Sequence, residues 1–306
     1  VKVYDTGDDL FRALEQLSIK KIIVSPHKLR EMKDSRLLDK FLESSISLTT
    51  TQPLSEWNSD KVTKDQFKEI QIEDLLPRKE ISINMQKIAS NLEGKRVMIT
   101  GAAGSIGSEI VRQVAAFNPY SLILIDQAET PLHSLKLEIK RKWKEVKAHT
   151  IVADIANKSR LEKIFKDASP DYIFHAAAYK HVPMMEENVS EAIQTNIQGT
   201  KVLADLAVKY GASKFVMIST DKAVNPTNVM GCSKRISEIY VQSLAKHIDE
   251  TSSGKTQFIT TRFGNVLGSN GSVIPFFREQ IKNGGPVTVT HPEITRYFMT
   301  IPEACQ

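Results

Sequence analysis

The feature that most constrains the fold is a regular alternation of apolar runs and helical patterns between Lys95 and Phe263. The runs are short, rich in β-branched residues and separated by helical patterns; they read RVMIT, SLILID, HTIVAD, DYIFHAA, KFVMIST and QFITTRF. Strands that are buried on both faces and joined by helices form parallel sheets with right-handed connections. The pattern therefore predicts an α/β fold with a Rossmann-type, doubly wound parallel sheet in residues 94–306.

Two further regions precede this domain. Residues 1–50 alternate helical patterns with the short apolar runs IIVSP and ISLTTT, so we expect a small, partial α/β annex. Residues 51–93 are polar and irregular and are interrupted by prolines, which predicts a connector that packs on the main domain. The chain begins without Met and stops at PEACQ, so we expect a piece of a longer protein whose substrate-binding subdomain is incomplete at its C-terminal end.

Composition and cysteine spacing argue against several classes of function. The 306 residues carry a net charge of +5, but basic residues share their helices with acidic ones, so we expect no nucleic-acid partner. An anionic small substrate accounts for the charge equally well. Cys232 and Cys305 lie far apart, so we expect neither a metal site nor a disulfide, and a reducing compartment is favoured. No stretch approaches the roughly 18 apolar residues of a membrane span, so this piece is not expected to enter a bilayer.

A glycine-rich loop joins the first strand of the main domain to its first helix. In TGAAGSIGSEI, the glycines Gly101, Gly104 and Gly107 are spaced three residues apart, and the helix that follows carries one apolar stripe. The first glycine permits a tight turn, the second a close approach to a pyrophosphate, and the third close packing of the helix. The loop, with Ser105 and Ile106, is therefore predicted to bind the pyrophosphate of a dinucleotide.

Residues at the ends of the next strands predict the rest of the cofactor site. Asp126 lies 19 residues after Gly107, where a carboxylate accepts hydrogen bonds from an adenosine ribose and repels a 2′-phosphate, so NAD is favoured over NADP. Asp154 and Ile155 suit an adenine contact, although Asp154 suits a helix N-cap equally well. Small residues after the fourth strand let a nicotinamide riboside approach the backbone, and we expect cofactor contacts from Ala176, Ala177, Ala178 and Asn196.

The loop after the fourth strand also carries polar residues that face the same cleft. Lys180 is predicted to hold an anionic or hydroxyl-rich substrate. His181 stands alone in a polar loop, which is more typical of a hydrogen-bonded structural residue than of a catalytic one.

Four segments of the chain are similar, in order, to those of one enzyme family. They read TGAAGSIGSEI, HAAAYKHVPMMEENVSEAIQTNIQGT, STDKAVNPTNVMGCSKR and RFGNVLGSNGSVIPFFREQIKNGGPVTVTHPEITRYFM. They resemble bacterial UDP-N-acetylglucosamine (UDP-GlcNAc) 4,6-dehydratases of the extended short-chain dehydrogenase/reductase family, in particular the large, membrane-anchored branch used in capsule, O-antigen and protein-glycan synthesis. The resemblance runs from about Ile72 to the C-terminus. It implies NAD, a UDP-sugar substrate, a homo-oligomer, and a parent protein in the inner membrane with a cytoplasmic catalytic domain.

The resemblance also implies roles for residues from the fifth strand onward. Lys222 corresponds to the base at C5 of the sugar, Asp221 to the acid at C6, and Thr220 to a hydrogen-bond partner of the C4 hydroxyl. Lys234 corresponds to the residue that binds the nicotinamide ribose. Met230 stands in the place of the Tyr of smaller relatives, as Met does in the large branch. Without that Tyr, the C4 hydroxyl proton passes to Asp221, to Lys222 or to a water relay. Substrate contacts are implied for Asn265, Ser272, Val273 and Arg296.

Two other functions share parts of this pattern. A UDP-sugar 4-epimerase uses the same cofactor site, but it needs no base at C5 and normally relies on the missing Tyr. A non-catalytic NAD(P)-binding sensor tolerates the loss of that Tyr, but it has no use for the acid–base capacity of Asp221, Lys222 and Lys234. The favoured prediction is therefore a hydro-lyase, a sugar-nucleotide 4,6-dehydratase.

Overall fold

The computed structural model describes residues 8–33, 37, 40–41, 46–51, 67–69, 85–252, 254–269, 271–289, 291–293 and 295–306. The chain divides into two compact units, Val1–Glu80 and Ile81–Gln306. Most of the connector expected at residues 51–93 lies outside the described residues, and the domain boundaries expected at residues 50 and 93 stay predictions.

The first unit contains a small α/β layer. Its sheet has the order β1 (Lys21–Val24), β2 (Ser47–Thr51), β3 (Phe67–Glu69), with β1 parallel and β3 antiparallel to β2. Helices α1 (Asp8–Gln16) and α2 (Pro26–Lys33) contribute to a separate apolar core, which consists of Leu14, Val24, Leu29, Met32 and Phe41. Helices and strands thus alternate here, as the apolar pattern predicts.

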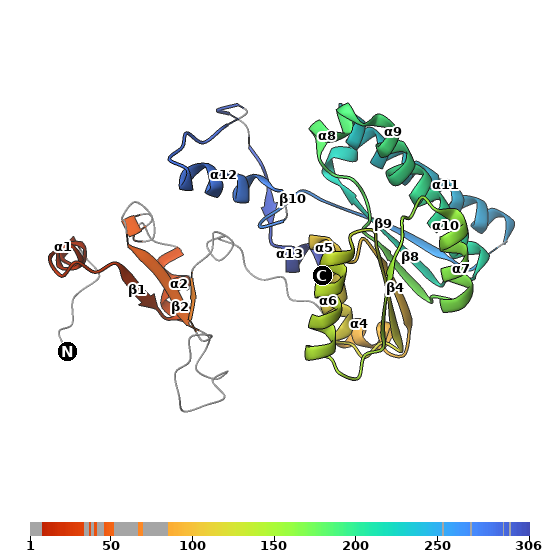
Figure 1. Cartoon of the computed structure of the whole chain (residues 1–306), viewed down its shortest axis with the longest axis horizontal. Helices are drawn as coiled ribbons and strands as arrows, with labels where there is room; N and C mark the ends of the chain where they lie inside the picture. The colour runs from red at the N-terminus through yellow and green to blue at the C-terminus, as the bar shows by residue number, and fades with distance from the viewer. Residues whose placement is uncertain are drawn as a thin grey trace. The chain divides into compact units, whose positions relative to one another are not determined.

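The second unit is built on a six-stranded sheet in the order β6-β5-β4-β7-β8-β9, and every neighbouring pair is parallel (Figure 1). The strands are β4 (Arg96–Thr100), β5 (Ser121–Asp126), β6 (Ala148–Val152), β7 (Tyr172–His175), β8 (Lys214–Thr220) and β9 (Gln257–Phe263). The predicted Rossmann-type, doubly wound sheet is confirmed. The strand order reverses between β4 and β7, which is where such sheets bind ligands.

Helices cover both faces of this sheet. Successive residues of a strand point to opposite faces, so the apolar residues of one strand need a helical layer on each side. Val97 and Ile99 of β4 contact a layer formed by α4 (Met85–Leu92), α5 (Ser105–Ala115), α6 (Glu129–Lys142) and α13 (Ile301–Cys305). Met98 contacts the opposite layer, formed by α7 (Lys158–Ala168), α10 (Thr200–Lys209) and α11 (Val229–Thr251). Figure 1 shows these two layers on either side of the strands.

Shorter elements follow the carboxyl ends of the last three strands. After β7 come α8 (Val182–Glu187), α9 (Val189–Glu191) and the π-helical segment η4 (Ala192–Gly199), and after β8 comes the 3₁₀ turn η5 (Asp221–Ala223). After β9, the short parallel strands β10 (Asn265–Val266) and β11 (Phe298–Met299) flank α12 (Val273–Lys282). Because the strands are parallel, all of these segments start at the same edge of the sheet as the glycine-rich loop. Among the described helices, none is both long and apolar enough to cross a bilayer.

Candidate active site

The glycine-rich loop has the geometry that its spacing predicts. Gly101 follows β4 with a φ of +65°, and a Cβ there would lie 2.6 Å from the backbone nitrogen of Ala177. A Cβ on Gly107 would lie 1.9 Å from the carbonyl oxygen of Gly101. Gly104 is in an extended conformation immediately before α5, which begins at Ser105. The loop therefore stays close to the sheet and leaves the first turn of α5 facing the carboxyl edge.

Asp126 is anchored at the carboxyl end of β5. Its Oδ2 accepts a hydrogen bond from the Ala103 amide at 2.9 Å, and its Oδ1 accepts one from the Ala128 amide at 2.9 Å. The carboxylate is thus fixed directly beside the glycine-rich loop. Each oxygen keeps a lone pair for a further donor, which is what binding of a ribose hydroxyl requires.

The two residues predicted at the adenine end have different environments. The N-cap of α7 is Asn157, whose side chain accepts from the Arg160 amide at 3.1 Å, so the alternative N-cap role for Asp154 is wrong. The chain makes one more turn before the helix starts, and the exposed Asp154 carboxylate accepts from the Ala156 amide at 2.8 Å. Ile155 is 5% exposed and its side chain belongs to the core. An adenine contact by this pair stays a prediction.

Asn196 holds the loop that follows β7. Its Oδ1 accepts from the Tyr179 amide at 2.8 Å, and its Nδ2 donates to the Tyr179 carbonyl at 3.1 Å and to Ser233 Oγ at 2.9 Å. Asn196 is 1% exposed, and Ala177 of the same loop lies against Gly101. The side chain that we expected at the cofactor therefore positions the backbone around Ala176, Ala177 and Ala178.

His175 is a structural residue that the sequence pattern did not single out. Its Nδ1 lies 2.8 Å from Thr100 Oγ1 and its Nε2 lies 2.8 Å from Thr200 Oγ1. Because the Thr200 hydroxyl donates to the Asn196 carbonyl at 2.6 Å, Nε2 is the protonated nitrogen and Nδ1 accepts from Thr100. Complete burial, with a smaller effect of Lys234, lowers the pKa of His175 from 6.5 to about 3. The neutral ring therefore links β4, β7 and α10.

The predicted acid–base residues form one contiguous cluster at the carboxyl end of β8. Thr220 Oγ1 donates to Asp221 Oδ1 at 2.9 Å, and Lys222 Nζ lies 3.1 Å from the same oxygen. Lys222 Nζ also lies 3.4 Å from Oδ1 of Asn265, which starts β10. Contacts between segments 43 residues apart thus bring a predicted substrate residue to the predicted base.

Asp221 is ionised in this arrangement. Burial opposes ionisation, but hydrogen bonds from Lys222 and Thr220 outweigh it and hold the pKa of Asp221 below 3.8. The role of acid at C6, which the resemblance implies for Asp221, requires a protonated carboxyl group. Without a substrate the carboxylate instead forms an ion pair, so it has to gain a proton before it can act as an acid.

Lys234 and Met230 lie on the buried face of the first turns of α11. Lys234 is 5% exposed and its Nζ donates to the Ile218 carbonyl on β8 at 2.7 Å. Burial lowers the pKa of Lys234 from 10.5 to about 8, although Glu238 opposes the shift. Met230 is 2% exposed and packs in a cluster with Met185, Ala192 and Tyr179. The place of the Tyr of smaller relatives is therefore filled by apolar packing.

Glu238 is a second buried residue that the sequence pattern did not single out. It lies four residues after Lys234 on α11 and is fully buried. Its Oε1 accepts a hydrogen bond from Arg262 Nε at 2.8 Å. Its Oε2 accepts one from Arg262 Nη2 and one from Arg235 Nη1, the latter at 3.2 Å. This ion-pair group joins α11 to the end of β9. The sequence feature that could have indicated Glu238 is its spacing of four residues from Lys234 in a predicted helix.

Lys180 and His181 approach the segment that follows β10. Lys180 Nζ lies 3.5 Å from Ser269 Oγ, and burial lowers the pKa of Lys180. A Cβ on Gly271 would lie 2.6 Å from Cε1 of His181, so the imidazole sits directly over that glycine. The loop after β7 and the segment predicted to bind substrate are therefore neighbours.

The remaining substrate residues lie on either side of this contact. Ser272 precedes α12, and its buried Oγ has no hydrogen-bond partner among the described residues. Val273 begins the helix and is 40% exposed. Arg296 is exposed and precedes Tyr297, whose carbonyl accepts from the Asn265 amide at 3.3 Å. The β10–β11 pairing thus brings Asn265 next to Tyr297, the residue that follows Arg296.

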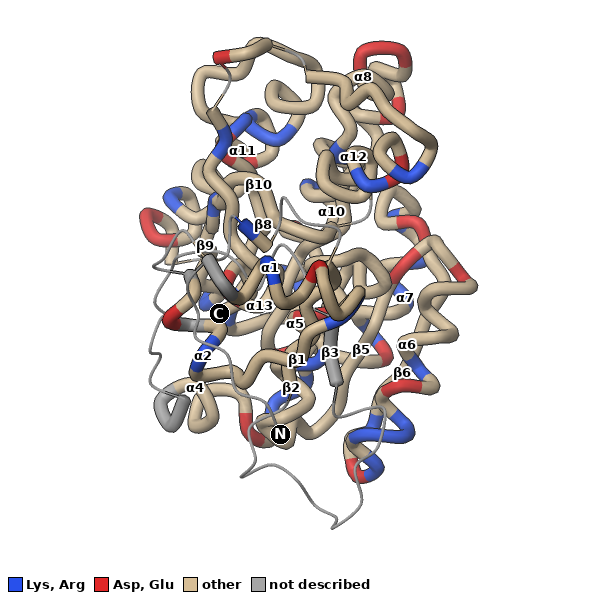
Figure 2. Tube along the Cα trace, turned by 90° about the vertical axis from the view of Figure 1, so that its left-hand side faces the viewer, with Lys and Arg blue, Asp and Glu red and all other residues tan. Residues whose placement is uncertain are grey.

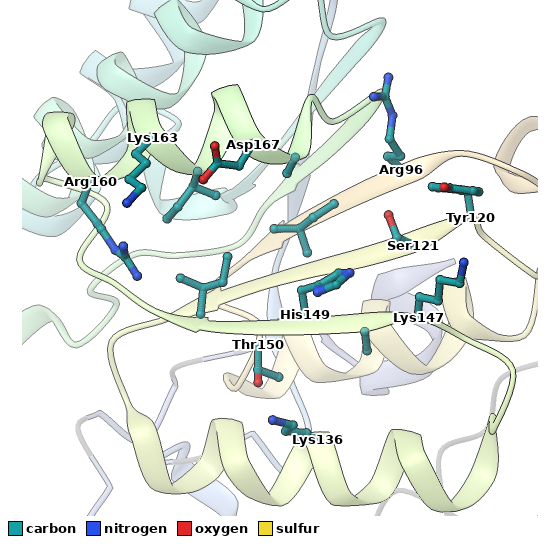
Figure 3. Close-up of a pocket in the computed structure, with 15 residues that line it drawn as sticks. Arg96, Tyr120, Ser121, Lys136, Lys147, His149, Thr150, Arg160, Lys163 and Asp167 are labelled. Carbon is teal, nitrogen blue, oxygen red and sulfur yellow. The ribbon is translucent and has the colours of Figure 1, made fainter.

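A cavity of about 760 Å³ runs along the edge strand β6, from the starts of β4, β5 and β6 to the first turns of α7 (Figure 3). Arg160 and Lys163 of α7 and Lys147 beside β6 lie around it, together with the carboxylate of Asp167. Within the described part of the chain, none of the predicted site residues lines it. Lysines beside the edge strand β6 discourage pairing with other strands. Figure 2 shows that basic and acidic residues are interspersed along the helices of this unit.

Comparison with known proteins relates the chain to one family. Residues 97–306 match the family model described as "Polysaccharide biosynthesis protein". The capsular polysaccharide biosynthesis protein CapD of Staphylococcus aureus is 44% identical over 305 residues, a match that covers 99% of this chain and 50% of that protein. The chain therefore spans about half the length of this relative.

Further relatives have more specific names. The UDP-N-acetylglucosamine 4,6-dehydratase (inverting) of Campylobacter jejuni is 33% identical and the UDP-glucose 4-epimerase of Rickettsia rickettsii is 35% identical; each match covers 69% of this chain, and 61% and 60% of those proteins. Among solved structures, Pen from Bacillus thuringiensis is 34% identical with a TM-score of 0.65, over 70% of this chain and 66% of that one.

Proposed function

The chain belongs to the polysaccharide biosynthesis protein family, and from that premise we propose that it is the catalytic part of an NAD-dependent 4,6-dehydratase of UDP-sugars. The observation that carries the proposal is the contact of Lys222 Nζ with both Asp221 and Asn265, at the carboxyl end of a strand next to a dinucleotide loop. The substrate proposed is UDP-GlcNAc and the product a UDP-4-keto-6-deoxy sugar.

The loop around Gly101 and Gly107 supports NAD as the cofactor. At both positions a Cβ would collide with backbone atoms, so the loop needs glycine for the tight turn and for the close helix packing of a dinucleotide-binding loop. The anchored carboxylate of Asp126 supports an unphosphorylated ribose, because it would repel a 2′-phosphate. A bound NAD would supply the acceptor for a hydride from C4 of the sugar and the donor of that hydride to C6.

The Lys222–Asp221 pair supports the proton transfers. Exclusion of water by substrate removes the solvation that favours two opposite charges, so the proton of Lys222 passes to Asp221 along their 3.1 Å contact. The pair then holds a neutral amine and a neutral carboxyl group. The amine removes the C5 proton, and the carboxyl group protonates the hydroxide that leaves C6 as water.

The same pair is restored at the end of the cycle. Lys222 returns its proton to C5 when the hydride arrives at C6. The proton of the C4 hydroxyl, which Thr220 hydrogen-bonds in this proposal, leaves by a water relay and re-protonates Lys222. The balance is one sugar hydroxyl and one proton lost as water, with no net change in the protein. Met230 needs no role in any of these transfers.

The buried hydroxyl of Ser272 supports a ligand at the start of α12, because an unpaired buried hydroxyl is costly unless a partner binds it. Arg296 suits the diphosphate, for which a planar guanidinium offers two parallel donors. Lys180, with its place near Ser269, suits the sugar hydroxyls or the phosphates. These three residues, Asn265 and Val273 form the proposed substrate site.

The test is incubation of the chain, and of the longest soluble form of its parent protein, with NAD and UDP-GlcNAc. The expected product is lighter than the substrate by one water in mass spectrometry. A product of unchanged mass with inverted C4 would instead establish the alternative, a UDP-sugar 4-epimerase, which the 35% identity to a protein of that name favours. Binding of NAD without conversion of any UDP-sugar by either form would establish the non-catalytic sensor.

The biological setting is part of the proposal. The resemblance to the large dehydratase branch supports a parent protein that is anchored in the inner membrane with this part in the cytoplasm, where it forms a homo-oligomer and supplies sugar precursors for surface polysaccharide. Detection of the parent protein in the membrane fraction, with its catalytic part accessible to protease from the cytoplasmic side, tests the location.

A further inference from the structure

A hydrogen bond joins the two segments that flank the glycine-rich loop. Gln127 Nε2 donates to the hydroxyl of Tyr179 at 3.2 Å. Gln127 follows the last residue of β5, Tyr179 lies four residues after the end of β7, and β4 lies between these strands in the sheet. The bond therefore crosses the carboxyl end of β4, where the glycine-rich loop starts.

A bound dinucleotide has to pass through the same span. In a doubly wound sheet the adenosine ribose is read after the second strand of the fold, here β5 with Asp126, and the other nucleotide lies beyond the strand-order reversal, at β7. The pyrophosphate between them lies at the glycine-rich loop. The Gln127–Tyr179 bond therefore joins the two sides of the groove at the position of the pyrophosphate.

The two halves of this contact differ in how firmly they are held. Both backbone groups of Tyr179 are bound by the buried amide of Asn196, and the Tyr179 ring packs on the cluster of Met185, Ala192 and Met230. Gln127 is exposed, and it directly follows the end of β5, where the Asp126 carboxylate accepts from the Ala103 and Ala128 amides. Rotation of the Gln127 side chain thus opens the contact while Tyr179 stays in place.

We propose that Gln127 and Tyr179 form a clasp that closes over the dinucleotide and slows its release. This inference rests on the proposed function, in which the hydride taken from C4 returns to the same sugar. The cofactor is then regenerated within each cycle and has no need to leave, so slow release does not limit turnover. Met230 acquires a supporting role in this arrangement, because it is part of the apolar surface on which Tyr179 rests.

The test measures release of NADH from the full chain. NADH is bound, an excess of NAD is added, and the loss of the fluorescence of bound NADH gives the dissociation rate. The variants are Tyr179→Phe, Gln127→Ala and the double variant, with Tyr210→Phe and Gln242→Ala as matched controls. Tyr210 packs against Phe165, away from the site, and Gln242 is exposed on α11.

We expect each single clasp variant to release NADH about 3- to 10-fold faster, the effect of losing one neutral hydrogen bond, and the double variant to be no faster than the singles. The controls should release NADH at the unsubstituted rate. Two outcomes would overturn the clasp but not the proposed cofactor. In one, the clasp variants bind NADH normally and release it at the unsubstituted rate. In the other, the rate increase in the double variant is the product of the increases in the single variants. Failure of the unsubstituted chain to bind NADH would overturn the proposed cofactor and the clasp together.

Discussion

At the scale of single residues, Lys222 carries the greatest part of the proposed chemistry. Lys222→Met removes the amine but keeps the aliphatic stem, so binding of UDP-GlcNAc should persist. We expect that the variant no longer exchanges the C5 hydrogen with deuterated solvent. Its dehydration rate should be lower by a factor of ~10²–10⁴, the usual contribution of a positioned acid or base. Mass spectrometry of substrate recovered from heavy water measures the exchange.

Met230→Tyr is the companion variant for this experiment. Met230 contributes shape to a buried cluster, so we expect the substitution to leave dehydration at least partly intact. Loss of activity in Met230→Tyr together with survival of activity in Lys222→Met would refute the proposed mechanism. Undiminished C5 exchange in Lys222→Met would make another group the base, and His181 would be the next residue to test.

His175 predicts a pH dependence of stability. Its pKa is about 3 in the folded chain and near 6.5 when unfolded, so the unfolded chain binds a proton first as the pH falls. The stabilisation is present above pH 6.5 and is lost as the pH falls towards 3. Relative to His175→Gln, the unsubstituted chain should lose about 2 kcal/mol of its unfolding free energy between pH 7 and pH 5. Urea unfolding at each pH measures this difference, and a constant difference would refute the assignment.

At the scale of elements, the loop between β4 and α5 sets the position of the cofactor. A Cβ on Gly107 would lie 1.9 Å from a backbone oxygen, which no side-chain movement relieves. We expect Gly107→Ala to lower the unfolding free energy by about 1–3 kcal/mol, as overpacking does, and to abolish NADH binding because α5 has to move.

The matched control is Gly254→Ala. Its Cβ would meet only side-chain atoms, at 3.3 Å from Val208 and 3.4 Å from Ile248, so a small adjustment accommodates it. Thermal unfolding and titration with NADH compare the two variants. If Gly254→Ala weakened NADH binding as much as Gly107→Ala, the effect would not arise from the loop.

At the scale of the whole molecule, the division into two units predicts independent folding of the second. All predicted cofactor and catalytic residues lie in Ile81–Gln306, and the apolar core of the first unit consists of its own residues. We expect residues 81–306 alone to unfold cooperatively and to bind NADH within about 3-fold of the full chain, because one core per unit suffices for folding. Calorimetry and NADH titration test this, and a non-cooperative transition would show that the first unit is required.

The fold and the cofactor loop were predictable from the sequence because local signals encode them. The six apolar runs became the six strands, with ends that moved by no more than two residues, since a strand that is buried on both faces is encoded by a continuous apolar run in its own residues. The glycine spacing likewise reports a backbone geometry within a few residues. For Asp154 the sequence left an adenine contact and a helix N-cap open; the N-cap of α7 is instead Asn157, because both residue types start helices and only the completed turn selects one.

What only the tertiary structure decided are the contacts between distant segments. Lys222 meets Asn265 across 43 residues, and His175 meets Thr100 across 75. The neutral ring of His175 and the hydrogen bonds of Asn196 follow from burial and from partners on other elements, whereas the charge of Asp221 is stabilised by its sequence neighbours Thr220 and Lys222. Sequence alone therefore determined which chemical groups are present and which strand ends carry them. Their protonation states and partners required the folded chain, because desolvation and hydrogen bonding depend on neighbours in space.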